Sequence, residues 1–183
     1  MKIAFLYAGQ GSQRVGMGRD LYDASPAFRA AFDAGHLDFD LHALCFEGAQ
    51  ETLNQTQYTQ PCMVAFACGV TAALFDAGIR PDYVAGLSLG EYSALEASGV
   101  LTTQSAIELA AYRGAAMAKA SEGIQSAMTA VLGLDREALM RCCEEAGELG
   151  IVQICNYNCP GQIVIGGEAA AVARAGELAK EAG

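Results

Sequence analysis

The fold of this chain is decided at residues 83–91, which read Tyr-Val-Ala-Gly-Leu-Ser-Leu-Gly-Glu. The pattern predicts a buried strand over Tyr83–Gly86, a tight turn that carries Ser88, and a helix directly after the turn. Gly-x-Ser-x-Gly between a strand and a helix is typical of a nucleophile elbow, which strains the serine backbone and lifts its hydroxyl clear of the sheet. The sequence therefore predicts a serine nucleophile at position 88.

The glycines of this pattern and the helix that follows favour a site for a negatively charged oxygen. Gly86 and Gly90 lack Cβ atoms, so the strand and the helix can approach closely enough for the turn to close. The helix is expected to start near Leu89. Its N-terminus offers unpaired N–H groups and the positive end of the helix dipole, both of which suit an oxyanion.

The composition indicates a globular protein and argues against one class of partner. The chain has 183 residues, of which 52% are hydrophobic and 17% charged, so it can bury a core. Its formal net charge is −10. Binding to nucleic acid needs clustered Lys and Arg, so we expect no nucleic-acid partner. A small anionic substrate held by one or two residues is still compatible with this charge.

Two apolar segments are interpreted as parts of the fold rather than as membrane or export signals. The run Pro61–Phe75 has about 15 residues, fewer than the roughly 20 that span a bilayer. The apolar residues after Lys2 are followed at once by the polar loop of residues 9–14, so a first β-strand over Lys2–Ala8 is expected there. We expect no membrane partner.

The cysteines indicate a reducing compartment and no metal site. There are seven, an odd number, and none forms a C-x-x-C pair. Cys62 and Cys68 lie in an apolar segment, which suits free buried thiols, and a cytoplasmic location is expected. No zinc pattern fits the spacing of the last four, so we expect neither metal nor cofactor. These four are Cys142, Cys143, Cys155 and Cys159.

A glycine-rich loop and a buried helix are expected in the N-terminal half. The loop of residues 9–13 follows the first strand, and a dinucleotide fingerprint would need a third small residue where Arg14 stands. The alternative is a loop whose backbone N–H groups face a cleft. A helix is expected to open at Gln60-Pro61 and to end near Gly78, and it should be buried because it is apolar almost all round.

The two histidines of the sequence, His36 and His42, are interpreted as ordinary surface or packing residues. Neither lies near a strand end that would aim it at Ser88.

Arg113 lies on the apolar stripe of a helix that Thr102 or Thr103 caps. No acidic side chain is within local reach along the helix. The guanidinium therefore either extends to solvent or binds a carboxylate from elsewhere, and an incoming anionic substrate is one such carboxylate. Spacing alone leaves both interpretations open. The stripe is formed by Leu109, Ala110, Ala116 and Met117.

The pattern from about Ser126 predicts a separate β-α-β-β-α unit, one strand short of a split β-α-β fold. We therefore expect two domains, residues 1–124 and 125–183. The predicted elements are a strand over Ala127–Leu134, a helix from its Asp135 cap to Ala146, a strand over Ile151–Asn156, a turn over Asn158–Gly161, a strand over Gln162–Ile165 and a helix over Glu168–Ala182.

Five motifs occur in order along essentially the whole chain. They are Gly9-Gln10-Gly11-Ser12-Gln13, Thr59-Gln60-Pro61, Gly86-Leu87-Ser88-Leu89-Gly90-Glu91, Tyr112-Arg113-Gly114 and Asn156-Tyr157-Asn158-Cys159-Pro160-Gly161-Gln162. Together they resemble the malonyl-CoA:acyl carrier protein transacylases, acyltransferases of fatty-acid and polyketide synthesis. The resemblance implies an α/β fold, with an α/β-hydrolase-like large subdomain and a ferredoxin-like small subdomain whose last strand is missing here.

The same resemblance implies a role for four residues. Ser88 would take the malonyl group from coenzyme A as an ester, and the carrier's phosphopantetheine thiol would then accept it. The backbone N–H groups of Gln10 and Leu89 would form the oxyanion hole. Arg113 would bind the malonyl carboxylate in a two-pronged ion pair. Malonyl-CoA is then a substrate, and acyl carrier protein is the partner.

The sequence departs from the family pattern in two places. Leu87 stands where the family usually has histidine. The family's general-base histidine follows the small subdomain, and nothing in this chain matches it. We expect the chain to lack the family's C-terminal part, and full activity to require more chain or another polypeptide, because losing such a partner costs on the order of 10⁴–10⁶ in rate.

Two alternatives remain open at this point. A serine hydrolase or thioesterase shares the elbow, although a hydrolase of neutral esters has no use for Arg113. An inactive fragment that binds the carrier or coenzyme A would explain the missing histidine. A basic patch for an acidic carrier is not evident, because the basic residues are scattered. They include Lys2, Arg14, Arg19, Arg80, Arg141 and Lys180.

Overall fold

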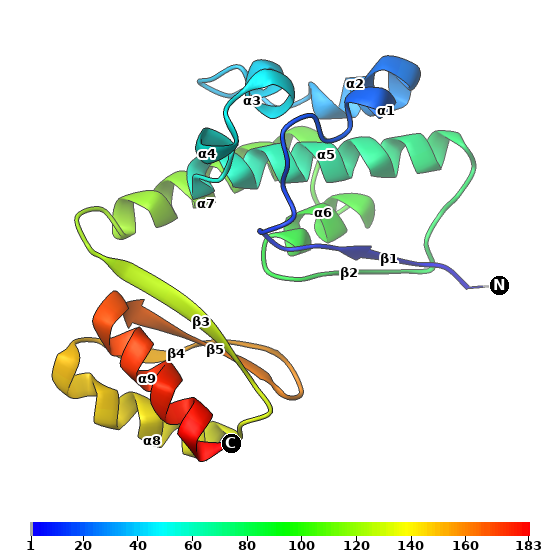
Figure 1. Cartoon of the computed structure of the whole chain (residues 1–183). Coiled ribbons are helices and arrows are strands. Elements are labelled where there is room, and N and C mark those ends of the chain that lie inside the picture. Colours follow the sequence, from blue (N-terminus) through cyan, green and yellow to red (C-terminus); the bar gives the residue numbers. More distant parts are fainter. Residues whose placement is uncertain (1) are drawn as a thin grey trace. The chain divides into compact units, whose positions relative to one another are not determined.

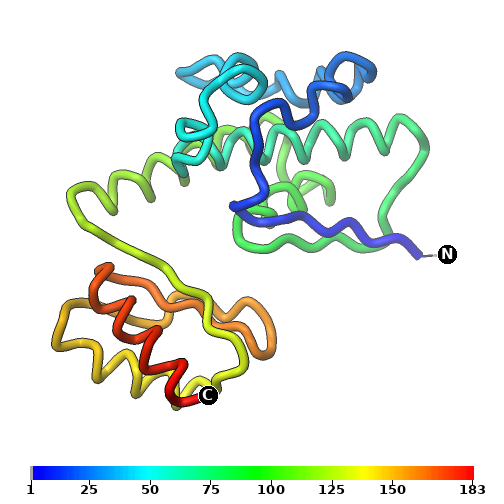
Figure 2. Tube along the Cα trace, in the orientation of Figure 1, coloured from blue at the N-terminus to red at the C-terminus, as the bar shows by residue number. Residues whose placement is uncertain are grey.

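A computed structural model describes residues 2–183, which form two compact units (Figures 1 and 2). One unit ends at Ala120, and the other runs from Ser121 to Gly183. Both contain helices and strands, so the predicted mixed α/β class is confirmed. The first unit contains β1 (Ala4–Tyr7), α1 (Arg19–Ala24), α2 (Pro26–Phe32), α3 (Leu41–Glu47), α4 (Gln50–Leu53), α5 (Thr56–Asp76), β2 (Tyr83–Gly86), α6 (Gly90–Ala97) and α7 (Thr103–Ala120).

The first unit is organised around the parallel pair β1 and β2. Ala4 lies opposite Tyr83 and Tyr7 lies opposite Gly86. The Leu87 N–H then donates to the Tyr7 carbonyl at 3.1 Å and extends the pairing by one residue. Both strands were predicted in these places, although β1 is shorter than expected. Because the carboxyl ends of parallel strands meet at one edge of a sheet, the loop after β1 lies beside the elbow after β2.

Helix α5 forms the core of this unit, as its apolar sequence predicts. In Figure 1 it runs between the short helices α1–α3 and the β1–β2 pair. On the side of the short helices, Phe28 of α2 is fully buried in a core cluster that includes Val64 and Cys68 of α5. On the strand side, the Phe5 and Phe75 rings stack at 6.4 Å, and the Tyr7 hydroxyl shares a 2.8 Å hydrogen bond with that of Thr71.

Two expectations about α5 are wrong. The helix starts at Thr56, not at Gln60-Pro61, because the Gln55 carbonyl already accepts from the N–H groups of Tyr58 and Thr59. Pro61 therefore lies inside the helix, where its missing N–H removes one helical bond. The helix has 21 residues, so its length does not exclude a bilayer span. In the most apolar 18-residue window of α5, 56% is buried inside the protein. This burial favours a core helix, because core helices can be as long and as apolar as membrane-spanning ones.

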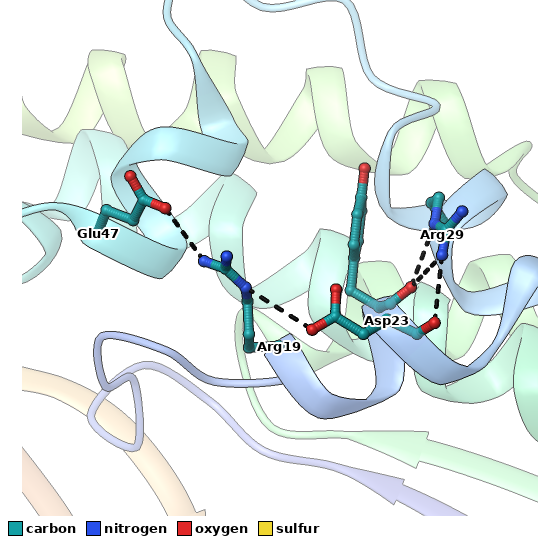
Figure 3. Close-up of polar contacts among 5 residues, drawn as sticks. Arg19, Asp23, Arg29 and Glu47 are labelled. Atoms are coloured by element: carbon teal, nitrogen blue, oxygen red, sulfur yellow. Dashed lines mark hydrogen bonds and ion pairs between the residues drawn. The ribbon is translucent and has the colours of Figure 1, made fainter.

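Charged contacts hold the short N-terminal helices together (Figure 3). The Arg19 guanidinium lies between Asp23 at 3.9 Å and Glu47 of α3 at 3.2 Å. The Arg29 guanidinium donates to the carbonyls of Tyr22 and Asp23 in the last turn of α1, where a cation is favourable. Both arginines are thus engaged within the fold. The expected cap of α2 is present, since the Ser25 hydroxyl accepts the Phe28 N–H, but α2 ends at Phe32, before Gly35.

The second unit is a three-stranded antiparallel sheet with helices α8 and α9. The strand order is β3-β5-β4, and the β-α-β-β-α sequence of elements is the predicted one. Its core lies between the helices and the sheet, around Leu139, Ile165 and Val172. The elements are β3 (Ser126–Leu132), α8 (Arg136–Ala146), the 3-10 turn η1 (Gly147–Leu149), β4 (Val152–Cys159), β5 (Gln162–Glu168) and α9 (Ala169–Ala182).

The turn predicted over Asn158–Gly161 is partly wrong. Asn158 and Cys159 belong to β4, and the connection to β5 consists of Pro160 and Gly161 alone. The Asn158 side chain donates to Gln162 Oε1 at 2.9 Å, so its amide stabilises the hairpin from within the strand. The asparagine and cysteine were interpreted as turn residues because Asn and Gly favour turns, but strand pairing outweighs that local preference here.

We expect Gly114→Ala to destabilise the first unit by about 1–3 kcal/mol. A Cβ at Gly114 of α7 would lie 2.7 Å from the Thr56 carbonyl oxygen and 2.9 Å from Gln57 Cα, so the two helices would have to separate. Urea unfolding followed by circular dichroism measures the change. The matched control is Gly176→Ala inside α9, where the nearest atom is at 3.9 Å. It should be neutral or stabilising. An unchanged midpoint for Gly114→Ala would contradict the tight packing of α7 on α5.

Candidate functional site

The elbow is closed by backbone contact between β2 and α6. A Cβ at Gly86 would lie 2.1 Å from the carbonyl of Gly90, and a Cβ at Gly90 would lie 2.3 Å from the Tyr7 carbonyl oxygen. Only hydrogen atoms fit at these two positions, as the sequence pattern requires. Ser88 has φ +52°, and it is the one non-glycine residue with positive φ in the part of the chain from residue 2 to 183. Its side chain is exposed, as a nucleophile at the top of an elbow should be.

The loop after β1 lies against the elbow. A Cβ at Gly9 would be 3.0 Å from the Leu87 carbonyl oxygen. Gln13 shapes this loop, because its Oε1 accepts from the Gly11 N–H at 2.9 Å and its Nε2 donates to Asn54 Oδ1 at 2.9 Å. Within residues 2–183, the main-chain N–H groups of Gln10 and Leu89 donate to no protein acceptor. Both groups are thus available to an oxygen of another molecule.

The guanidinium of Arg113 lies at the serine. Its Nη2 donates to Ser88 Oγ at 3.0 Å, and its Nη1 donates to Gln60 Oε1 at 2.7 Å. The Tyr92 ring lies 6.0 Å away on one side. Among residues 2–183, no carboxylate forms an ion pair with Arg113. Of the two interpretations left open by spacing, extension to solvent is therefore excluded, and the cation has no protein carboxylate in the described part of the chain.

Gln60 and Thr56 belong to this site, although the sequence analysis assigned neither of them a function. Gln60 is fully buried, and its Nε2 donates to Thr56 Oγ1 at 2.8 Å and lies 3.3 Å from the Met117 sulfur. The Thr56 hydroxyl donates to Gln10 Oε1 at 2.9 Å. A glutamine at the start of a helix predicted to be buried was the available signal, since a buried amide needs polar partners.

Neither histidine lies at the serine. His36 Nδ1 is 2.9 Å from Gln104 Nε2 and 3.5 Å from Glu108 Oε1, while the His42 ring packs against Tyr22 and Phe46. The interpretation of both as surface or packing residues is confirmed.

The seven cysteines are free. Cys62 and Cys68 are buried, as predicted. The adjacent Cys45 thiol and burial raise the pKa of Cys62, and burial raises the pKa of Cys68, so these two thiols are poor nucleophiles. Among residues 2–183, no three His, Cys, Asp or Glu side chains are grouped so that they could hold a metal ion.

Residues 4–183 match a known protein family, described as acyl transferase domain. The chain belongs to this family.

Several relatives of this acyl transferase domain are named malonyl CoA-acyl carrier protein transacylase. Those of Bacillus subtilis and Haemophilus influenzae are 46% and 44% identical over 185 and 188 residues, and each alignment covers the whole chain. Among solved structures, the transacylase of Streptococcus pneumoniae has 48% identity and a TM-score of 0.86. A malonyl-transacylase in complex with a type II polyketide synthase acyl carrier protein has 41% identity and a TM-score of 0.89. The chain spans 58–60% of the length of these relatives.

We expect Ser88→Gly to be more stable than Ser88→Ala by about 1 kcal/mol, because glycine adopts positive φ without the steric cost that any Cβ incurs. Both variants lose the hydrogen bond from Arg113, so the difference in stability between them reports the cost of positive φ at residue 88. The midpoints of urea unfolding measure the difference. A glycine variant that is no more stable than the alanine variant would show that the elbow is not strained at this residue.

Proposed function

We propose that this acyl transferase domain accepts a malonyl group from coenzyme A on Ser88 and passes it to the phosphopantetheine thiol of an acyl carrier protein. One observation carries the proposal: the Arg113 guanidinium lies 3.0 Å from Ser88 Oγ, so a nucleophile and a carboxylate-binding cation are adjacent. The names of the relatives agree with this choice of acyl group and partner.

The short distance between Ser88 and Arg113 suits malonyl in particular. The thioester carbonyl carbon and the carboxylate carbon of a malonyl group are separated by one methylene, about 2.5 Å apart. A carboxylate must therefore sit close to any hydroxyl that attacks the carbonyl. Arg113 presents a planar fork that matches a carboxylate in two hydrogen bonds. A hydrolase of neutral esters gains nothing from this cation, which argues against that alternative.

Transfer takes two steps through an ester. Ser88 Oγ attacks the thioester carbonyl and gives its proton to a general base. The resulting oxyanion, held by the N–H groups of Gln10 and Leu89, then collapses and expels the coenzyme A thiolate, which takes up that proton. The carrier thiol attacks the seryl ester in the same way and restores the serine. One oxyanion donor of this kind is worth about 10²–10³ in rate.

The general base is proposed to come from a histidine outside these 183 residues. His36 and His42 have other partners, and Arg113, which bonds to Ser88 Oγ, is a permanent donor that cannot accept its proton. Acylation by these residues alone is therefore slow.

The remaining features of the proposal concern fold and setting. An α/β-hydrolase-like subdomain is proposed over residues 1–124 and a ferredoxin-like subdomain over residues 125–183, whereas the two compact units divide slightly earlier, after Ala120. The parallel β1–β2 pair with its elbow and the order β3-β5-β4 support this. No metal or cofactor takes part, since the chemistry needs only an ester, and the reaction is cytoplasmic with no membrane or nucleic acid.

Incubation of the 183-residue polypeptide with malonyl-CoA, with and without imidazole, tests the proposal. We expect one malonyl group on the peptide that contains Ser88, formed faster as imidazole replaces the missing base. The ester should persist in water and disappear when a pantetheine thiol is added. Ser88→Ala is the control and should remain unlabelled.

Three results would contradict the proposal. Label on another peptide would exclude Ser88 as the nucleophile. Release of malonate to water without a thiol would favour a thioesterase. Turnover without imidazole that equals that of the Bacillus subtilis transacylase would contradict the external base.

We expect Arg113→Ala to reduce malonyl loading of Ser88 about 10- to 100-fold more than acetyl loading, because a hydrogen-bonded ion pair of this kind is worth about 1.5–3 kcal/mol. Arg113→Lys keeps the charge without the fork and should lie in between. Single-turnover rates with malonyl-CoA and acetyl-CoA give the ratio. Arg141→Ala, which removes an exposed arginine of α8, is the control. Equal losses for the two acyl groups would refute a role in selectivity.

A further inference from the structure

A single line of hydrogen bonds joins two parts of the site, which we call its two arms: Arg113, and the loop that carries Gln10. It runs from Arg113 Nη1 to Gln60 Oε1 at 2.7 Å, from Gln60 Nε2 to Thr56 Oγ1 at 2.8 Å, and from the Thr56 hydroxyl to Gln10 Oε1 at 2.9 Å. Arg113 also donates to Ser88. The carboxylate-binding cation and the loop that carries the Gln10 N–H are therefore physically connected through Thr56.

The direction of donation along this line is fixed from one end. A guanidinium can only donate, so Gln60 must turn its Oε1 toward Arg113 and its Nε2 toward Thr56. The Thr56 oxygen then accepts from Gln60, and its proton points at Gln10 Oε1. Each bond polarises the next, which strengthens the series. Gln60 is fully buried, so its amide has no water with which to exchange these partners.

The Thr56 hydroxyl bonds to side chains and not to the backbone of its own helix. Thr56 is the first residue of α5, and no side chain caps the N-terminus of that helix. The N-cap position, at which Thr and Ser commonly accept a backbone N–H of the first turn, is occupied by Gln55. The Thr56 hydroxyl accepts from Gln60 and donates to Gln10. Both partners of the hydroxyl thus belong to the line of bonds between Arg113 and Gln10.

Loss of the Thr56 hydroxyl has a local consequence. The loop of residues 9–14 stays attached through Gln13, which bonds to Asn54. Gln10, in contrast, has no other side-chain partner within residues 2–183. The Gln10 segment and the Gln60 amide would both gain freedom, whereas the rest of the loop would not.

We propose that Thr56 is a positioning residue, whose hydroxyl holds the Gln10 segment of the oxyanion loop and, through Gln60, the Arg113 guanidinium in register with Ser88. The inference rests on the proposed function for the meaning of the two arms. The Thr56 hydroxyl alone would then keep the Gln10 N–H, which binds the oxyanion, aligned with the Arg113 guanidinium, which binds the carboxylate.

Thr56→Val, which replaces the hydroxyl by a methyl group of similar size, tests the inference. Both arms depend on Thr56, so we expect acetyl loading of Ser88 to fall about tenfold through the oxyanion arm, and malonyl loading to fall further through Arg113. Arg113→Ala, in contrast, should reduce malonyl loading much more than acetyl loading. Thr56→Ser should restore both rates.

Nuclear magnetic resonance of the 183-residue polypeptide gives a readout that does not depend on activity. In the wild type, the Arg113 guanidinium protons should give separate signals, because both terminal nitrogens are hydrogen-bonded. In Thr56→Val these signals should broaden or average, and the side-chain amide signals of Gln10 and Gln60 should shift. Thr56→Ser should retain the wild-type pattern.

Thr59→Val is the matched control. Thr59 lies in the same turn, is fully buried, and donates to the carbonyls of Leu53 and Gln55, outside the line of bonds. Its loss should lower stability and leave the Arg113 signals and the loading ratio unchanged. Equal effects of Thr56→Val and Thr59→Val, or unchanged Gln10 and Gln60 signals in Thr56→Val, would overturn the inference. A wild type that loads neither acyl group would refute the proposed function, while the magnetic resonance result would still decide the positioning role.

Discussion

The site depends on one steric constraint, the contact of backbone with backbone at the elbow. Gly86 and Gly90 approach so closely that a Cβ at either would overlap main-chain atoms. This contact places the start of α6 over the end of β2 and leaves Ser88, the middle one of the three residues between them, in the left-handed region. Ser88 accepts that conformation although it has a Cβ. The energy needed to hold it there comes from packing elsewhere in the unit, as is usual for strained functional residues.

The polar part of the site consists of side chains, not backbone, and each side chain fixes the orientation of the next through a hydrogen bond. Arg113 can only donate, so the orientation of each amide and hydroxyl beyond it is determined. The buried helix α5 supplies the middle of this series, because Gln60 sits at a core position of a largely apolar helix. The same helix therefore holds the core together and aligns the site. A polar series that is fully satisfied tends to specify one arrangement, whereas a half-satisfied one would be costly.

Much of the fold could be predicted because its signals are local. The strand Tyr83–Gly86, the Asp135 cap of α8 and the antiparallel hairpin of β4 and β5 follow from residues that interact with near neighbours. The start of α5 could not be predicted in this way. Proline normally marks a first turn, but five residues before Pro61 are already helical because α7 packs closely against their start at Gly114. Tertiary contact outweighed the local rule.

The sequence by itself determined the elbow. A strand followed by Gly-x-Ser-x-Gly predicts one backbone conformation for the turn. The steric cost of a Cβ at either glycine depends on residues close in sequence, so the spacing of the glycines reveals it. It also determined that Arg113 lies on an apolar stripe, but not where its guanidinium points. Only the tertiary structure decided that, by setting α7 against α5 so that residues 53 positions apart share a hydrogen bond and the cation reaches Ser88. The physical reason is that long polar side chains have many rotamers of similar energy, and partners distant in sequence choose among them.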